Sequence, residues 1–307
     1  MTLTRAGTML VTVRDWIRWS STRFARADLT YGHGTSEPWD EALALVGGWL
    51  RIPPDRLGDM LDARLTEDER DALAECVRRR CEERVPVPYL TGRAWLAGAE
   101  FEVDERVLIP RSPIAFLLAE QLQPWLGARV PRRILDLCTG SGCLGILAAL
   151  AFPDAEVVLA DLSAEALEVA RANVRRFDLA ERVTVLESDG FDGLAPGTAP
   201  FDLVICNPPY VDAADLAAMA PEFTHEPELA LSGGGDGIDL VDRLLRSAPR
   251  CLAEDGLMVL EVGNSAPALL ARFPTLPLTW PELDQGGTGV ALIEAADLGA
   301  GLHGGQR

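Results

Sequence analysis

Lysine is absent from this chain of 307 residues, so all 28 of its basic side chains are arginines. They face 47 acidic side chains, which gives a formal net charge of −19. The imbalance is uneven, because residues 1–95 hold 14 arginines against 15 acids and the remainder holds 14 against 32. A strongly acidic body repels phosphate backbones and attracts basic partners. The composition therefore disfavours direct nucleic-acid binding and suits a basic protein as the partner.

Long apolar runs, paired cysteines and clustered histidines are missing too. No uninterrupted apolar stretch reaches the roughly 18 residues of a membrane span, and residues 1–14 lack the apolar segment and cleavage site of a secretory signal. None of the six cysteines stands in a C-x-x-C pair, and only three histidines are present. We therefore predict no membrane association and no metal site, and we expect a cytoplasmic protein with reduced thiols. No pattern indicates an oligomeric state.

Hydrophobic residues make up 48% of the chain, enough for a large domain with a small companion. Apolar residues recur at three- and four-residue spacing in Asp40–Leu50 and Thr66–Cys81, which is typical of amphipathic helices. Thr66 and Glu69 have the spacing of a capping box. Trp95–Val103 alternates weakly around glycine, as a short hairpin does. We predict four parts: a helical domain over 1–84, a hairpin linker over 85–110, the main domain over 111–297 and a disordered tail over 298–307.

Short apolar runs alternate with helical segments from about Pro131 onward. The runs are Ile134–Leu137, Val157–Ala160, Val183–Leu186, Leu203–Cys206 and Leu257–Val262, and Gly289–Ile293 is a candidate edge strand. The helical segments are Cys143–Ala151, Ala164–Phe177 and Ile238–Leu252. Continuous apolar strands with helical crossovers predict an α/β fold with a parallel, doubly wound sheet.

A glycine loop follows the first of these strands and contains Cys138, Thr139, Gly140, Ser141 and Gly142. Glycines let the backbone turn sharply and approach a ligand, and the next helix presents free N–H groups. Ligands in open parallel sheets bind beyond the carboxyl ends of the strands. The loop therefore predicts a cofactor site at that edge of the sheet.

Two acidic residues at strand ends bear on the identity of the cofactor. Asp161 ends the second strand, where a carboxylate can bind two ribose hydroxyls, and with the loop glycines it also fits the nicotinamide-dinucleotide fingerprint. Asp136 sits poorly near a pyrophosphate but suits the ammonium and sulfonium groups of S-adenosylmethionine. We predict S-adenosylmethionine as the cofactor and S-adenosylhomocysteine as the product. The structural alternatives are that Asp136 is a helix cap or strand end, and that Asp161 caps the helix near Ser163.

The fourth strand runs directly into Asn207-Pro208-Pro209-Tyr210. Two prolines fix the backbone and remove donors, which leaves a turn biased towards acceptors. A planar NH2 group offers two donors, which the Asn207 side chain and the Pro208 carbonyl can accept while Tyr210 stacks on the plane. The pattern predicts methylation of an amide or aromatic amine, and a structural proline corner is the alternative. The segment after the turn, with His225 and Glu226, is either a simple loop or a lid.

These motifs resemble those of the protein-glutamine methyltransferases. The resemblance rests on the strand and loop at 135–142, Asp161, the turn at 207–210, and the linker segments 88–92 and 107–111. It implies a helical substrate-binding domain, a hairpin linker and a seven-stranded, Rossmann-like methyltransferase domain. It also implies that Asp136 and the loop hold the methionine end, that Asp161 holds the ribose and that Asp189 holds the adenine amine.

One branch of this family modifies translation release factors, and another modifies the third protein of the large ribosomal subunit. Arg111-Ser112-Pro113-Ile114 looks like the ribosomal branch, as do the segments 31–35, 38–41, 225–229 and 261–265. The resemblance therefore implies methylation of a glutamine in that basic ribosomal protein. A release-factor methyltransferase, a nucleic-acid amino-methyltransferase and a ribosome-assembly factor with a vestigial pocket are the alternatives. Two residues depart from the family, Phe116 at a usual glutamate and Gly190 at a usual large side chain.

Overall fold

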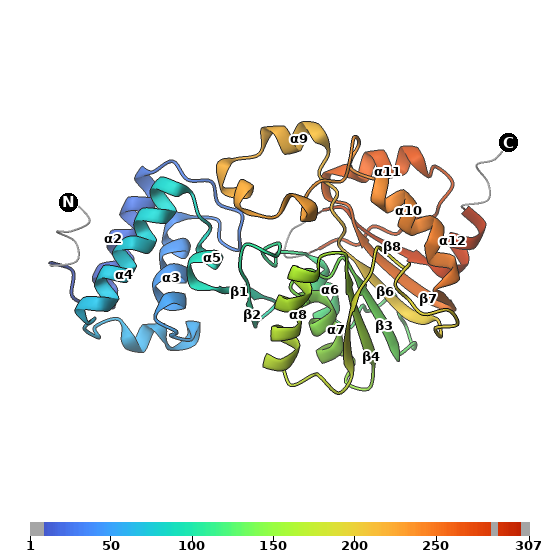
Figure 1. Cartoon of the computed structure of the whole chain (residues 1–307), viewed down its shortest axis with the longest axis horizontal. Coiled ribbons are helices and arrows are strands. Elements are labelled where there is room, and N and C mark those ends of the chain that lie inside the picture. The colour runs from blue at the N-terminus through green and yellow to red at the C-terminus, as the bar shows by residue number, and fades with distance from the viewer. Residues whose placement is uncertain (1–8, 284–287, 302–307) are drawn as a thin grey trace. The chain divides into compact units, whose positions relative to one another are not determined.

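The computed structural model describes residues 9–283 and 288–301, which form two compact units (Figure 1). Unit 1 comprises the described residues up to Trp95 together with two short segments, Val103–Glu105 and Ala220–His225. Unit 2 comprises the other described residues. The presence of Ala220–His225 in unit 1 is not foreseen from the sequence, where this segment follows the proline turn of the main domain.

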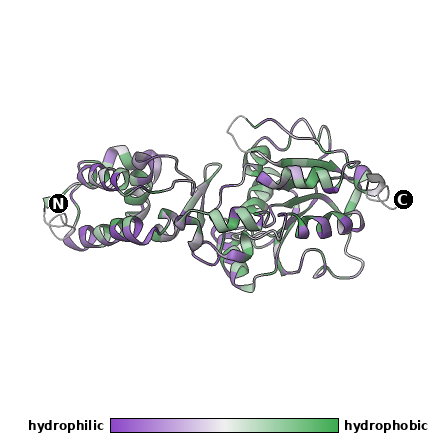
Figure 2. Cartoon of the chain, turned by 90° about the horizontal axis from the view of Figure 1, so that it is seen from above, coloured by the Kyte–Doolittle hydropathy of each residue, from purple (hydrophilic) through white to green (hydrophobic). Residues whose placement is uncertain are grey.

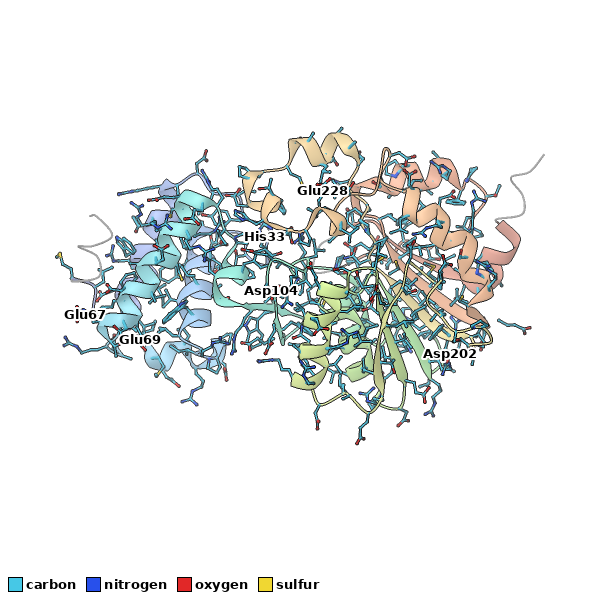
Figure 3. The ribbon with its side chains drawn as sticks, viewed as in Figure 1. His33, Glu67, Glu69, Asp104, Asp202 and Glu228 are labelled. Carbon is cyan, nitrogen blue, oxygen red and sulfur yellow. The ribbon has the colours of Figure 1, made fainter. Side chains whose placement is uncertain are left out.

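Unit 1 is built on three longer helices joined by shorter ones. Their bounds are α2 Val13–Arg26, α3 Pro38–Trp49, η1 Pro54–Met60, α4 Glu67–Arg78, η2 Arg79–Glu83 and α5 Val87–Thr91. Thr66 and Glu69 exchange hydrogen bonds with each other's backbone N–H groups, so the predicted capping box at the start of α4 is confirmed. Figure 3 labels Glu67 and Glu69 in this first turn.

The helices of unit 1 enclose their own apolar core. Trp16 and Trp19 are both buried, and their rings meet edge to face with centroids 5.3 Å apart. They pack with Leu45 of α3 and Leu73 of α4 in one cluster. Trp16 and Trp19 are therefore core residues of unit 1.

A buried charge cluster links three parts of unit 1. The guanidinium of Arg80 is fully buried and lies 2.6 Å from Glu41 and 3.5 Å from Glu222. It also donates to the carbonyl of Thr30 at 3.0 Å. Burial alone would raise the pKa of Glu222, but the Thr30 N–H and the charges of Arg80 and Arg84 hold it below the ordinary value. Arg80 thereby ties the segment Ala220–His225 to the helices.

Arg80→Met should lower the free energy of unfolding by about 3–5 kcal/mol, because it leaves the buried carboxylate of Glu41 without a compensating charge and Glu222 with Arg84 alone. Urea denaturation followed by circular dichroism measures this change. Arg14→Met is the matched control, because Arg14 pairs with Asp62 on the surface with both side chains more than half exposed. The control should change stability by less than about 1 kcal/mol. Equal effects of the two variants would contradict a special role for the buried cluster.

A two-stranded hairpin lies where weak alternation predicts one. Its strands are β1 Arg93–Leu96 and β2 Ala99–Glu102. Ala97 and Gly98 between them have φ values of 47° and 80°. Positive φ at both central residues is the feature of a tight hairpin turn that glycine accommodates. The helix α6, Ile114–Ala119, follows in unit 2.

The main sheet of unit 2 has six strands within the described residues, in the order β5-β4-β3-β6-β7-β8. The strands are β3 Arg133–Leu137, β4 Glu156–Asp161, β5 Val183–Glu187, β6 Phe201–Cys206, β7 Leu252–Glu261 and β8 Val290–Glu294. All neighbours are parallel except β8, which runs antiparallel to β7. Beyond β8, Thr279 forms an antiparallel bridge with Leu292 in place of a full seventh strand. The predicted α/β class with a mostly parallel sheet is confirmed.

Helices cover both faces of this sheet, with the bounds α7 Cys143–Ala151, α8 Ala164–Arg176, α10 Asp239–Ser247, α11 Ala266–Arg272 and α12 Ala295–Gly301. Ile134 packs in the cluster of α6, α7 and α8, while its neighbour Leu135 packs in the cluster of α10, α11 and α12. Except for the edge strand β5, the strands are therefore apolar on both sides, which explains their continuous apolar runs in the sequence. In Figure 2 the strands are mostly hydrophobic, whereas the helices carry hydrophobic and hydrophilic residues together.

Several boundaries differ from those expected. The helix predicted to reach Leu252 ends at Ser247, since Pro249 supplies no N–H for its continuation and a short turn, η5 Ala248–Arg250, follows. The strand predicted from Leu257 begins at Leu252, opposite Phe201. The helix α12 includes the first residues of the segment predicted as a tail, and residues 302–307 lie outside the described part. No helix among the described residues is long and apolar enough to cross a membrane.

Candidate active site

A cavity of about 300 Å³ lies at the carboxyl ends of the parallel strands of unit 2. Its walls come from the loops that follow β3, β4, β5 and β6, from residues of the segments 106–112 and 227–232, and from α10. Eight of the predicted site residues line it: Cys138, Thr139, Gly140, Ser141, Asp161, Asp189, Asn207 and Pro209. Four others lie outside its lining: Asp136, Gly142, Pro208 and Tyr210. Figure 3 labels Asp202 at the opposite, amino end of β6.

The glycine loop turns by placing three residues in the left-handed region. Cys138, Gly140 and Gly142 have φ values of 56°, 55° and 82°. A Cβ on Gly142 would come within 3.1 Å of Leu159, and one on Gly145 would overlap the same side chain. Glycine at these positions therefore lets α7 begin directly against the sheet, with its first N–H groups at the loop.

Asp136 fixes the position of this loop through hydrogen bonds. Its Oδ2 accepts a hydrogen bond from the N–H of Gly145 at 2.8 Å and another from the hydroxyl of Thr139. Its Oδ1 is buried and has no hydrogen-bond partner among the described residues. Burial raises the pKa of Asp136 to about 7, although both hydrogen bonds act in the opposite direction. Asp136 thus caps the first turn of α7, one of the alternatives for it, and also keeps one acceptor unsatisfied.

Asp161, the last residue of the neighbouring strand β4, also fixes the position of the loop. One of its oxygens accepts from the N–H of Gly140 at 2.8 Å and the other from the N–H of Ser163 at 2.9 Å. Ser163 itself caps α8 through the N–H of Ala166, so Asp161 is not the cap of that helix. Burial raises the pKa of Asp161. Each carboxylate oxygen has a further lone pair, which leaves capacity for ligand hydroxyls at the cavity.

Asp189 forms an ion pair with Arg243 of α10, and both residues line the cavity. Hydrogen bonds from Arg243 hold the pKa of Asp189 below its ordinary value, so this carboxylate is ionised. Gly190 beside it has a φ of 58°, and a Cβ there would lie 2.8 Å from Leu244. The close approach of α10 therefore explains why a large side chain is absent at position 190. Arg243 is a cavity residue that the sequence does not identify.

The proline turn presents one side chain and one ring to the cavity. Asn207 and Pro209 line it, and Oδ1 of Asn207 is buried without a hydrogen-bond partner in the part of the chain that is described. Tyr210, expected to stack on a substrate, instead donates its hydroxyl to Glu261 at 2.9 Å. Burial raises the pKa of Tyr210, so it keeps its proton and acts as a donor.

Two further loops, both among the segments that carry the family resemblance, complete the cavity wall. Arg111 binds Glu226 with two hydrogen bonds of 2.6 and 2.8 Å, and Glu226 also accepts from the N–H of Ile109. This pair joins the segment 106–112 to the segment 226–232. Pro227, Leu229, Ala230 and Ser232 then line the cavity, so the segment after the turn is part of its wall. Figure 3 labels Glu228 on this segment.

A mostly parallel sheet with a glycine loop, strand-end carboxylates and an amide-bearing turn around one cavity fits an S-adenosylmethionine-dependent methyltransferase. The family model of the methyltransferase small domain matches residues 115–271. The ribosomal protein uL3 glutamine methyltransferase of Bordetella pertussis is 46% identical over 290 residues, which cover 94% of this chain and 97% of that protein. The protein of the same name from Burkholderia pseudomallei is 45% identical over 305 residues, covering 97% and 99%. The chain therefore belongs to the family of ribosomal protein uL3 glutamine methyltransferases.

Solved structures support the fold. The catalytic domain of hMettl16, in complex with MAT2A 3′UTR hairpin 6, has a TM-score of 0.50 and 17% identity, and the match covers 73% of this chain and 80% of that one. At this identity the likeness shows the Rossmann-like fold alone. The family findings confirm the predicted methyltransferase class and the predicted ribosomal branch.

The raised pKa of Asp136 predicts a pH dependence of stability. Between its ordinary value of 3.8 and about 7, the unfolded chain has lost this proton while the folded chain keeps it. The free energy of unfolding should therefore fall as pH rises through this window, by up to about 1.4 kcal/mol per pH unit from this group. Urea denaturation at several pH values measures the free energy of unfolding of both proteins. The value for Asp136→Asn should rise relative to that of the wild type up to about pH 7, and the difference should then stay constant. Parallel curves for the two proteins would contradict the assignment.

Proposed function

We propose that this chain transfers a methyl group from S-adenosylmethionine to the side-chain amide nitrogen of a glutamine in the large-subunit ribosomal protein uL3, leaving S-adenosylhomocysteine. The observation that carries the proposal is the buried Oδ1 of Asn207, which has no hydrogen-bond partner in the described part of the chain and lies at the end of β6 in the same cavity as Asp161 and Asp189. The names of the two relatives supply the substrate. We further propose that the reaction takes place in the cytoplasm.

The residues around the cavity fit S-adenosylmethionine. A volume of about 300 Å³ is at the lower end of small-molecule sites. Buried atoms without partners among the described residues include Oδ1 of Asp136 and Oγ of Ser141 beside the glycine loop. We assign Asp136 and the loop Cys138–Gly142 to the methionine end, Asp161 to the ribose and Asp189 to the adenine amine. Arg243 would share Asp189 with that amine and hold the carboxylate in place.

The turn supplies orientation to a weak nucleophile. An amide nitrogen is unreactive because its lone pair is delocalised, and the bound cofactor contributes an electrophilic methyl carbon on a sulfonium that leaves as a neutral thioether. Oδ1 of Asn207 and the carbonyl of Pro208 would each accept one amide hydrogen, which orients the nitrogen and draws electron density towards it. Pro209 forms the adjoining cavity wall. No strong general base is required, since the nitrogen becomes acidic once it has gained the methyl group and its proton can then pass to solvent water.

Unit 1 is the part we assign to recognition of the ribosomal protein. The support is its helical build and the resemblance of the whole chain to protein-glutamine methyltransferases. The acidic surplus that is consistent with a basic substrate lies outside residues 1–95, because residues 96–307 hold 14 arginines against 32 acids. The same surplus opposes a nucleic-acid substrate, since phosphate binding depends on basic side chains.

The substrate assignment predicts one additional methyl group on uL3, carried by a glutamine, when the purified enzyme acts on it with S-adenosylmethionine. Tandem mass spectrometry of uL3, a release factor and ribosomal RNA treated in parallel locates the methyl group. Cells that lack the enzyme should contain uL3 that is lighter by one methyl group. A methyl group found on the release factor or the RNA, with none on uL3, overturns the substrate and leaves only the chemistry.

The role of Asn207 predicts that Asn207→Ala lowers the single-turnover rate by about 10²–10³, as loss of one preorganised polar group does. Cofactor affinity and melting temperature should stay close to wild type. Asn207→Asp keeps the acceptor and should retain partial activity. The matched control is Asn264→Ala, since Asn264 is exposed and does not line the cavity. A proline corner without a catalytic role predicts the opposite result, a lowered melting temperature with a normal rate in the folded fraction.

A further inference from the structure

Glu261 is a buried carboxylate at the carboxyl end of β7 with both oxygens occupied. Oε1 accepts from the hydroxyl of Tyr210 at 2.9 Å, and Oε2 accepts from the hydroxyl of Ser112 at 2.5 Å. The side chain does not line the cavity. Burying a carboxylate costs free energy, so the burial of an acid outside the cavity wall needs an explanation other than ligand binding.

Tyr210, the last residue of the proline turn, is held on three sides. Its hydroxyl is bound by Glu261, and its carbonyl accepts from the hydroxyl of Ser265 at 2.7 Å. Its ring lies against Gly263, where a Cβ would come within 2.5 Å of the ring carbon Cε2. These contacts fix the ring, the hydroxyl and the carbonyl of Tyr210 in one arrangement. Its fixed position can define the position of the turn.

The two ends of the turn are attached to consecutive residues of β7. Cys206, which precedes the turn, pairs with Leu260 in the parallel ladder. Tyr210, which ends it, is bound to Glu261. Pro208 and Pro209 between them have restricted φ angles, so a turn that is fixed at both ends has little freedom left. These two attachments together form a clamp on the turn, and Asn207 lies between them.

We propose that Glu261 is a positioning residue for methyl transfer: by binding Tyr210 it fixes the proline turn and aims Asn207 at the amide nitrogen. The proposal rests on the proposed function. A displacement of a reacting group by about 1 Å can cost about 10² in rate, so a clamp of this kind has a kinetic consequence even where it adds little stability. Ser112 completes the arrangement by binding the second oxygen of Glu261 and so orienting it.

The surroundings of Glu261 determine how it responds to pH. Burial raises its pKa, while the hydrogen bonds from Ser112 and Tyr210 and the charge of Arg111 act in the opposite direction. The charged groups facing the pair are Arg111 and Glu226, which are bound to each other. When Glu261 takes up a proton, it loses part of its capacity to accept from both hydroxyls. The turnover rate should therefore fall on the acid side at a pH above the ordinary range of a glutamate.

The least disruptive test is a substitution that removes only the hydroxyl of Tyr210. Tyr210→Phe and Glu261→Met should each lower kcat by about 10–100-fold at saturating cofactor and uL3. The dissociation constant of S-adenosylmethionine, measured by calorimetry, should not change. The double variant should be no slower than the slower single variant, because both changes remove the same contact. Glu261→Gln keeps the shape and an acceptor, so it should retain more activity than Glu261→Met. The acid limb of its kcat–pH profile should move relative to that of the wild type, since only the titration of Asp136 and Asp161 then contributes to it.

Glu294→Gln is the matched control, because Glu294 lies at the other end of the sheet, paired with Arg129, and should show a wild-type rate and pH profile. A wild-type kcat in Tyr210→Phe, or an unchanged acid limb in Glu261→Gln, overturns the positioning role. The same holds if the two variants lower the melting temperature while the folded fraction keeps the wild-type kcat. A wild-type enzyme that binds the cofactor but methylates no glutamine overturns the proposed function, and the positioning role with it.

Discussion

The parallel ladder of the sheet aligns the candidate site along one row of paired residues. Leu137 of β3 pairs with Ala160 of β4 on one side and with Cys206 of β6 on the other, and Cys206 pairs with Leu260 of β7. The next residue in each strand or loop is Cys138, Asp161, Asn207 or Glu261. Four segments far apart in the chain therefore present their first residue beyond this row at the same edge. The cavity, the glycine loop and the clamped turn all depend on this register.

Three acids at this edge, of which Asp136 and Glu261 are buried and Asp161 is half-buried, have no arginine bonded to them among the described residues. Asp136 and Asp161 accept from backbone N–H groups of the loop and helix starts, and Glu261 accepts from two hydroxyls. Each has its pKa raised by burial. A carboxylate held in this way fixes the backbone or side chain that donates to it, at a cost in solvation. These acids thus lower the stability of the fold while they fix the geometry of the site.

The arginines that this chain has in place of lysine bind several groups at once. Arg80 binds Glu41, Glu222 and the carbonyl of Thr30 at once, and Arg111 binds Glu226 through two nitrogens. The planar guanidinium offers five donors in a fixed fork, whereas an ammonium offers a point charge. Both arginines connect segments that lie more than a hundred residues from one another. They hold Ala220–His225 in unit 1 and the next segment, from Glu226, at the cavity wall of unit 2.

The sequence by itself determined the elements and the chemistry near each strand end. Apolar runs and capping residues are local signals, and so are the glycine loop and the Asn-Pro-Pro-Tyr turn; together they indicated the α/β class and the family. Contacts between distant residues leave no such periodic trace. Only the tertiary structure decided that Arg243 binds Asp189 across 54 positions, that Glu226 binds Arg111 across 115, and that Tyr210 is bound to Glu261 across 51 and does not line the cavity. These pairings follow from how strands and helices pack, which no single segment specifies.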